Sequence, residues 1–219
     1  MRAERDKIGL ILLAAGGSTR MGCPKQLLAF SGGESFLRHA CRIALQTPFR
    51  PIVVVLGSEA AKCREQIEDL FVLSVVNEAW QEGMAGSLRL GLDTLLLARP
   101  AVEQAMVMLA DQPGVSAYSL LRLADSGSPL GLAASSYGDV IGVPALFPRD
   151  LFPELRALRG DAGARRVLAA HSGRVTLVPL PEAARDIDTP RDYINHLKGE
   201  SGVEEGFIST DSRDLMTPH

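Results

Sequence analysis

The amino-acid sequence predicts an α/β protein with a mostly parallel sheet covered by helices. Apolar, β-branched runs alternate along the chain with stretches of helical period, which is the pattern of parallel strands joined by helical connections. The chain has 219 residues, of which 46% are hydrophobic, so it can bury one substantial core. One domain is therefore expected rather than two.

The individual elements follow from this alternation. Strands are expected at residues 8–14, 51–56, 72–76, 104–110, 131–136 and 174–179. Helices are expected at 34–46, 58–69, 85–98 and 116–125, and as a pair within 147–171 that is broken at Gly160. Ser58, Ser116 and Asp161 are the expected N-caps of 58–69, of 116–125 and of the second helix of the pair. Residues 1–198 are expected to form the domain, and the polar, aperiodic residues 199–219 a disordered tail.

Composition and charge argue against several classes of function. The formal net charge is -3 and no long basic run occurs, so no nucleic-acid partner is expected. No apolar stretch approaches the length of a bilayer span, so no membrane partner is expected either. The cysteines form no C-x-x-C pair, and Glu4 and Asp6 interrupt the basic start that a signal peptide needs. A reducing, cytoplasmic location is therefore expected.

The most informative segment is residues 8–25, in which an apolar run enters a glycine loop that delivers Arg20 and Lys25. Glycines let backbone N–H groups approach phosphate oxygens, and the two cations neutralise charge that the amides cannot. A P-loop is unlike this segment, because Cys23 stands where the P-loop lysine belongs. A dinucleotide-binding fingerprint fails as well, because its glycine spacing is absent. The loop therefore indicates a third kind of phosphate site.

An acidic residue at the end of an expected strand indicates a metal site. Asp111 follows the strand at 104–110, and Pro113 forces the chain to turn there. The carboxylate is therefore expected in the crevice where open α/β sheets hold ligands. Mg²⁺ prefers one or two carboxylates together with phosphate oxygens and water, so Asp111 is a candidate magnesium ligand.

A second acidic pair, Asp186 and Asp188, follows the last expected strand. One of these carboxylates could converge with Asp111 on a divalent ion. The segment could equally serve to start a helix near Pro190, with Thr189 as its N-cap. Both interpretations stay open on the residues alone.

The segment 77–87 connects an expected strand to a leucine-rich helix. Gly83 and Gly86 allow close backbone approach, and the Ser87 hydroxyl can hydrogen-bond a ribose, a base or a phosphate. Trp80 could merely cover the core. A strand-to-helix loop is a frequent place for binding residues, which favours a ligand-binding role for this segment.

Together these residues resemble the nucleotidyltransferases of the molybdenum cofactor cytidylyltransferase type, within the wider group that carries an L-A-A-G-x-S-x-R-M-G-x-x-K signature. In this chain the signature spans Leu13 to Lys25. The resemblance covers about residues 8–197 in collinear order, through Asn77, Gly83-Met84, Ser87, Asp111-Gln112-Pro113, residues 160–165 and residues 186–190.

The resemblance implies a single Rossmann-like α/β/α domain, and Mg²⁺-dependent transfer of a nucleoside monophosphate from an NTP to an acceptor phosphate with release of pyrophosphate. It implies that Lys25, Arg20 and Asp111 are catalytic. It also implies that Asp111 and Asp188 bind Mg²⁺. The implied nucleotide-binding residues are Ala14, Ala15, Gly16, Gly17, Ser18, Arg20, Met21, Gly22, Lys25, Asn77, Gly83 and Ser87.

Finer features of the resemblance concern the base and the acceptor. Ala15 resembles the cytidylyl-type members and favours CTP, while the resemblance as a whole implies molybdopterin as acceptor and a molybdoenzyme as partner. The implied acceptor-binding residues are Gly142, Pro144, Gly160, Asp161 and Arg165. Val143 departs from the Gly-His-Pro segment of related cofactor enzymes. Two alternatives therefore stay open: another acceptor, such as a sugar or polyol phosphate, and a cofactor carrier without transferase activity.

Overall fold

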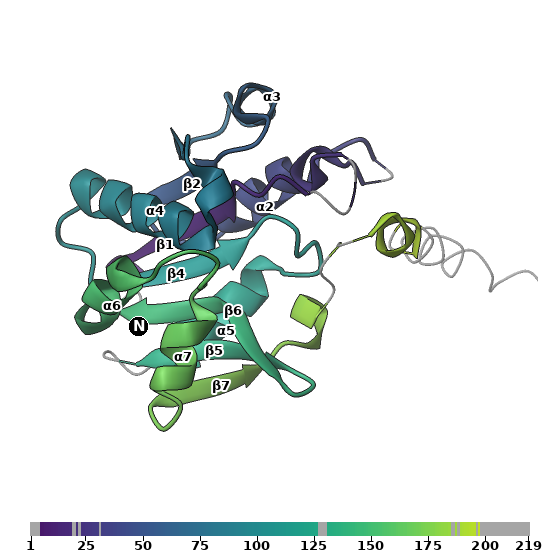
Figure 1. Ribbon diagram of the computed structural model, residues 1–219. Helices are drawn as coiled ribbons and strands as arrows, with labels where there is room; N and C mark the ends of the chain where they lie inside the picture. The colour runs from purple at the N-terminus through teal and green to yellow at the C-terminus, as the bar shows by residue number, and fades with distance from the viewer. Residues whose placement is uncertain are drawn as a thin grey trace, which may run out of the picture.

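The computed structural model describes residues 5–18, 21, 23–30, 32–126, 131–184, 187, 189–195 and 197. Its centre is a seven-stranded sheet with the order β3-β2-β1-β4-β6-β5-β7 (Figure 1). The strands are β1 (Ile8–Ala14), β2 (Ile52–Leu56), β3 (Leu73–Val76), β4 (Gln104–Leu109), β5 (Leu132–Tyr137), β6 (Val140–Pro148) and β7 (Val175–Pro179). All six expected strands are present within one residue at either end. The expected tail at 199–219 lies outside the described residues.

Strand β6 is the element that the sequence analysis did not anticipate. Strands β1 to β4 are mutually parallel and β5 is parallel to β7, whereas β6 runs antiparallel to both β4 and β5. Gly142 and Pro144 interrupt its apolar run, and such residues weaken a strand signal. The pairing shows how they are accommodated: Ala145 faces Ala134 and Gly142 faces Ser135, so Pro144 lies in a bulge and its missing N–H costs no ladder bond.

Helices connect the strands and cover both faces of the sheet. They are α2 (Phe36–Leu45), α3 (Ala60–Glu65), α4 (Met84–Ala98), α5 (Ala117–Ser126), α6 (Phe152–Ala157) and α7 (Arg165–Ala170). Single 3₁₀ turns are η1 (Lys25–Leu27), η2 (Trp80–Glu82), η3 (Arg149–Leu151) and η4 (Pro181–Ala184), and residues 190–195 are helical. Among the described residues, no helix has both the length and the apolar character to cross a bilayer.

The two faces of β1 show the three-layer architecture directly. Leu10 and Leu12 belong to a buried cluster with side chains of α2, α3 and α5. Ile11 and Leu13 point to the opposite face and belong to a second cluster with α4, α6 and α7. Successive side chains of a strand alternate between faces, so a strand that is apolar throughout must be covered on both sides. Figure 1 shows α4, α6 and α7 together on the near face of the sheet.

The helix starts agree with the sequence analysis in part. Ser116 caps α5 as expected, because its hydroxyl accepts a hydrogen bond from the Ser119 N–H at 3.2 Å. Ser58 does not cap α3: the N-cap is Glu59, and the Ser58 backbone is engaged by the glycine loop instead. Asp161 does not cap α7, which begins at Arg165 with Ala164 as a cap without a side-chain bond.

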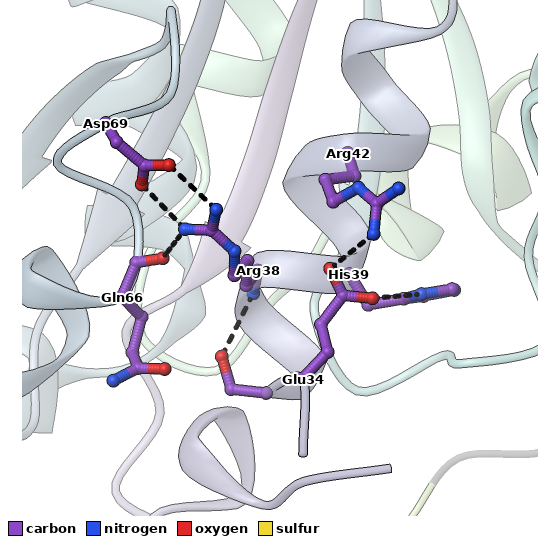
Figure 2. A network of polar contacts seen from close by, with 7 residues as sticks. Glu34, Arg38, His39, Arg42, Gln66 and Asp69 are labelled. Carbon is purple, nitrogen blue, oxygen red and sulfur yellow. Dashed lines mark hydrogen bonds and ion pairs between the residues drawn. The ribbon is translucent and has the colours of Figure 1, made fainter. Parts of the chain in front are cut away.

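Helix α2 is tied to the connection between α3 and β3 by a polar network (Figure 2). Arg38 donates to both carboxylate oxygens of Asp69, at 2.6 and 2.7 Å, and to the Gln66 carbonyl at 2.8 Å. The hydrogen bonds from this guanidinium lower the pKa of Asp69 to about 2. Glu34, in the loop before α2, contacts His39 and Arg42 of that helix. These contacts hold α2 in place beside the loop that precedes it.

Candidate active site

The site lies where the order of the sheet reverses. The chain runs outward from β1 through β2 to β3, and α4 then returns it to β4 on the other side of β1. The carboxyl ends of β1 and β4 meet at this switch point, which is where open α/β sheets hold ligands. A cavity of about 500 Å³ opens there. Its lining includes Leu13, Ala14, Ala15, Gly16, Gly17, Ser18, Lys25, Gln26, Trp80, Gln81, Gly83, Met84, Ser87, Leu109, Ala110, Asp111 and Asp161.

The glycine loop continues directly from β1 and forms one wall of the cavity. Gly17 has to be a glycine, because a Cβ there would lie 2.5 Å from the Trp80 ring. Ser18 has a φ of 51°, and its hydroxyl accepts a hydrogen bond from the Lys25 N–H at 2.9 Å. This bond holds the Lys25 backbone next to Ser18 in the glycine loop. Arg20 and Gly22 lie outside the described residues.

Met21, an expected nucleotide-binding residue, does not line the cavity. Its side chain is buried in a small cluster with Phe36 and Ile187. The same cluster is contacted by Tyr193, whose hydroxyl donates to the Ala29 carbonyl at 2.6 Å. Met21 therefore anchors the glycine loop to this cluster.

Lys25 and Asp111 face each other across the base of the cavity. The Lys25 Nζ lies 3.0 Å from Asp111 Oδ2, and the two side chains are only 15% and 26% exposed. The other carboxylate oxygen, Asp111 Oδ1, is buried and has no hydrogen-bond partner among the described residues. A buried carboxylate oxygen without a partner is costly, and a cation is the ligand that would satisfy it. Asp111 Oδ1 is therefore available as one ligand of a divalent metal ion, while among the described residues no three acidic, histidine or cysteine side chains come together.

The segment that carries Asp188 is attached to the same strand end. The Ile187 N–H donates to the Asp111 carbonyl at 3.3 Å, and the Ile187 side chain is buried. Asp186 and Asp188 themselves lie outside the described residues. Thr189 caps the following helix: its hydroxyl accepts from the Asp192 N–H at 3.2 Å, and Asp192 accepts from the Thr189 N–H at 2.8 Å. The helix-start interpretation is thus confirmed, and it places Ile187 beside Asp111.

The 77–87 segment forms the wall opposite the glycine loop. Asn77 donates to the Ser87 hydroxyl at 2.9 Å and accepts from the Ala79 N–H at 3.1 Å. Both side chains are buried, but only Ser87 reaches the cavity. Asn77 therefore orients Ser87 and shapes the turn that follows β3.

The expected acceptor residues fall into two places. Asp161 lines the cavity. Gly160 is held next to it, because the Gly160 carbonyl accepts from the Ala85 N–H at 3.0 Å. Gly83 packs so closely here that a Cβ would lie 2.4 Å from the Gly160 carbonyl carbon.

The second place is the β5–β6 hairpin. Arg165 donates to the Tyr137 hydroxyl at 2.9 Å, and both groups lie over Gly142, where a Cβ would come within 2.8 Å of Tyr137. Pro144 is buried next to them and its carbonyl accepts from Ser135 at 2.6 Å. These residues are outside the cavity lining and form a separate group next to the sheet.

Three residues at or near the site have places that the sequence did not define. Gln26 is 4% exposed and lines the cavity, and its place between Lys25 and the apolar pair Leu27-Leu28 was the available signal. The sequence left open whether Trp80 covers the core or belongs to a binding loop. In the structure it packs against the core and on Gly17, and it lines the cavity. Gln112 is buried away from the cavity and ties β4 to the Val143 and Ala183 carbonyls, at 3.2 and 3.0 Å.

A family model described as a MobA-like NTP transferase domain matches residues 10–175. The chain belongs to this family. Membership confirms the resemblance seen in the motifs, the Rossmann-like fold and the enzyme class, so the protein is a nucleotidyltransferase with nucleotide substrates.

Individual relatives of this MobA-like chain carry varied names. Nicotine blue oxidoreductase of Paenarthrobacter nicotinovorans is 32% identical over 192 residues, which cover 82% of this chain and 91% of that protein. The purine catabolism protein PucB of Bacillus subtilis (strain 168) is 30% identical over 196 residues, which cover 84% and 92%. A crystal structure of Rv0371c from Mycobacterium tuberculosis H37Rv, complexed with manganese, is 30% identical with a TM-score of 0.73, covering 87% of this chain and 98% of that one.

Proposed function

We propose that this nucleotidyltransferase transfers CMP from CTP to molybdopterin and releases pyrophosphate, with Mg²⁺ as its metal ion. The observation that carries the reaction type is the Lys25–Asp111 pair, which sets a cation and a carboxylate with a buried, unpartnered oxygen beside a glycine loop. The choice of CTP rests on Ala15, which lines the cavity, and on the motif resemblance.

The chemistry asks the protein for positioning and charge neutralisation. The acceptor phosphate is already ionised at neutral pH, so no side-chain nucleophile is needed. Both reacting groups are negatively charged, and the loop amides together with Lys25 and Arg20 would stabilise the charge on the triphosphate oxygens. Asp111 and Asp188 would hold Mg²⁺, which when bound supplies further neutralisation of phosphate charge.

The nucleotide would lie between the two walls of the cavity. Ala14 to Ser18 form one wall and Gly83 and Ser87 the other, with Asn77 orienting Ser87. Asp161 also lines the cavity, and the Gly160 carbonyl next to it accepts from the Ala85 N–H in the first turn of α4. The acceptor would therefore approach from the Asp161 side, with Arg165 and Gly142 beyond it to meet its anionic groups.

Two alternatives share part of this site. The same transfer to a sugar or polyol phosphate would keep Lys25, Asp111 and Asp188 and change only the acceptor side. A cofactor carrier would need neither the paired cation nor the metal carboxylates, and their presence favours an enzyme. The name of the Paenarthrobacter nicotinovorans relative adds an oxidoreductase to the activities that the assay must include.

The test is pyrophosphate release from each of the four NTPs with Mg²⁺ or Mn²⁺, with and without molybdopterin, followed by a panel of sugar and polyol phosphates. CTP-specific release that requires molybdopterin is the expected result. Release only with a sugar phosphate would replace the acceptor and retain the mechanism. No release with any pair, together with molybdopterin binding, would favour the carrier. Consumption of NADH or NADPH with a dye substrate would favour the oxidoreductase.

A further inference from the structure

Gln26 is a buried amide inside the glycine-loop wall. Its side-chain Nε2 donates to the Gly16 carbonyl and to the Ser58 carbonyl, both at 3.3 Å. Its Oε1 lies 3.4 Å from the Ser18 hydroxyl, which donates to it. One side chain therefore connects the loop after β1 to the loop after β2.

These contacts determine which way the peptide groups of the loop face. In a trans peptide the C=O of one residue and the N–H of the next point in opposite directions. The Gly16 carbonyl is held by Gln26, so the Gly17 N–H points away from Gln26. The Ala15 carbonyl accepts from the Ser58 N–H at 3.1 Å, so the Gly16 N–H points away from β2 as well.

Neither the Gly16 nor the Gly17 N–H has an acceptor in the part of the chain that the structure describes. Gly16 also faces open space, since nothing lies within 4 Å of the position a Cβ would take. Both residues line the cavity. Adjacent amides that point the same way form an anion-binding concavity.

We propose that Gln26 is a positioning residue. It holds the Gly17 amide toward the phosphates of the nucleotide by occupying the Gly16 carbonyl behind it. Through its bond to the Ser58 carbonyl it also fixes the residue whose N–H holds the Ala15 carbonyl behind the Gly16 amide. The inference rests on the proposed function of the loop as the triphosphate site. Without the two donors of Gln26, the Gly16–Gly17 peptide is free to rotate, and both amides lose their common direction. Gln26 acts through the backbone and needs no contact with the base.

The matched pair of variants is Gln26→Leu and Gln104→Leu. Leucine is close to glutamine in size and has no donors. Gln104 is also a buried glutamine, at the start of β4, and its Nε2 has no partner among the described residues, so the control loses no bond that this Nε2 donates to them. Trp80 is the single tryptophan of the chain and packs on Gly17, so its fluorescence reports binding at the loop without a label.

The titrations use CTP and inorganic tripolyphosphate, which has no base. A hydrogen bond to a charged phosphate contributes enough that losing one or two weakens binding roughly 10- to 100-fold. Gln26→Leu is expected to bind both ligands more weakly by that factor, while Gln104→Leu binds both with the affinity of the wild type. Unchanged affinity for both ligands in Gln26→Leu would overturn the proposal. Weaker binding of CTP with unchanged binding of tripolyphosphate would overturn it too, because Gln26 would then contact the nucleoside.

The wild-type titration separates this inference from the function on which it rests. If the wild-type protein binds none of the four NTPs, the proposed function and the inference fail together. If it binds CTP and Gln26→Leu binds equally well, only the inference fails. Thermal melting checks the fold of each variant. Should Gln26→Leu unfold, Gln26→Asn is titrated by the same criteria, because its shorter amide cannot span both carbonyls.

Discussion

The Lys25 ammonium lies 3.0 Å from Asp111 Oδ2 and so joins the glycine loop after β1 to the end of β4. The two residues are 86 positions apart in sequence, and the parallel pairing of β1 with β4 brings them together. Both side chains line the cavity, and Asp111 Oδ1 is buried without a described partner. The pair is therefore the most informative target for mutation.

Lys25→Ala is expected to lower kcat/KM by roughly 10²-fold or more, because a fixed cation that stabilises transition-state charge is lost. Steady-state kinetics with saturating metal ion measure the effect. Lys62→Ala is the control, since Lys62 is an exposed lysine on α3 that pairs only with Glu59 among the described residues. Near-wild-type turnover of Lys25→Ala would remove this residue from the mechanism.

Asp111→Asn is expected to raise the Mg²⁺ or Mn²⁺ concentration needed for half-maximal activity by about 10-fold or more, because a neutral amide is a poorer ligand than a carboxylate. Metal titrations at fixed NTP measure this. Asp93→Asn serves as control, because Asp93 lies on α4 outside the cavity lining, in an ion pair with Arg156. A metal requirement that stays the same in Asp111→Asn would contradict the ligand assignment.

Gly83→Ala is expected to separate the loop before α4 from the loop between α6 and α7. Gly83 has a φ of 110°, and a Cβ there would lie 2.4 Å from the Gly160 carbonyl carbon. Strained backbone of this kind costs on the order of 1–3 kcal/mol, so thermal unfolding should occur at a lower temperature. Gly173→Ala, with open space around its Cβ position, should leave the melting temperature nearly unchanged. Equal melting temperatures for the two variants would show that the close packing is not maintained in solution.

The Arg38–Asp69 pair makes stability depend on acid pH. The guanidinium hydrogen bonds lower the pKa of Asp69 from 3.8 to about 2, so the folded state holds this carboxylate ionised more strongly than the unfolded chain does. The stabilisation is therefore complete above about pH 4 and is lost as the pH falls to about 2. At pH 7 the melting temperature of Asp69→Asn should be lower than that of the wild type, and this difference should disappear at about pH 2. Asp139→Asn, at an exposed aspartate without an ion pair among the described residues, is the control. A difference that is the same at both pH values would contradict this linkage.

Local patterns determined most of the framework from the sequence alone. Strand β1 and its glycine loop could be predicted because an uninterrupted apolar run followed by glycines has few other structures available. The place of Asp111 followed from its position after a buried strand and before Pro113. The family signature then assigned a reaction class that the comparisons confirm. Each of these signals lies within a short segment of the chain.

The tertiary structure decided whatever depends on segments far apart in sequence. Strand β6 forms because β4 and β5 both offer it a pairing edge, which outweighs the weak strand signal of Gly142 and Pro144. Gln26 acquires its role only when the ends of β1 and β2 lie side by side, so that one amide reaches two carbonyls. The sequence by itself thus determined the kinds of element and the chemistry of the loop. Only the folded chain decided which groups face the cavity, because hydrogen-bond partners are chosen by three-dimensional proximity.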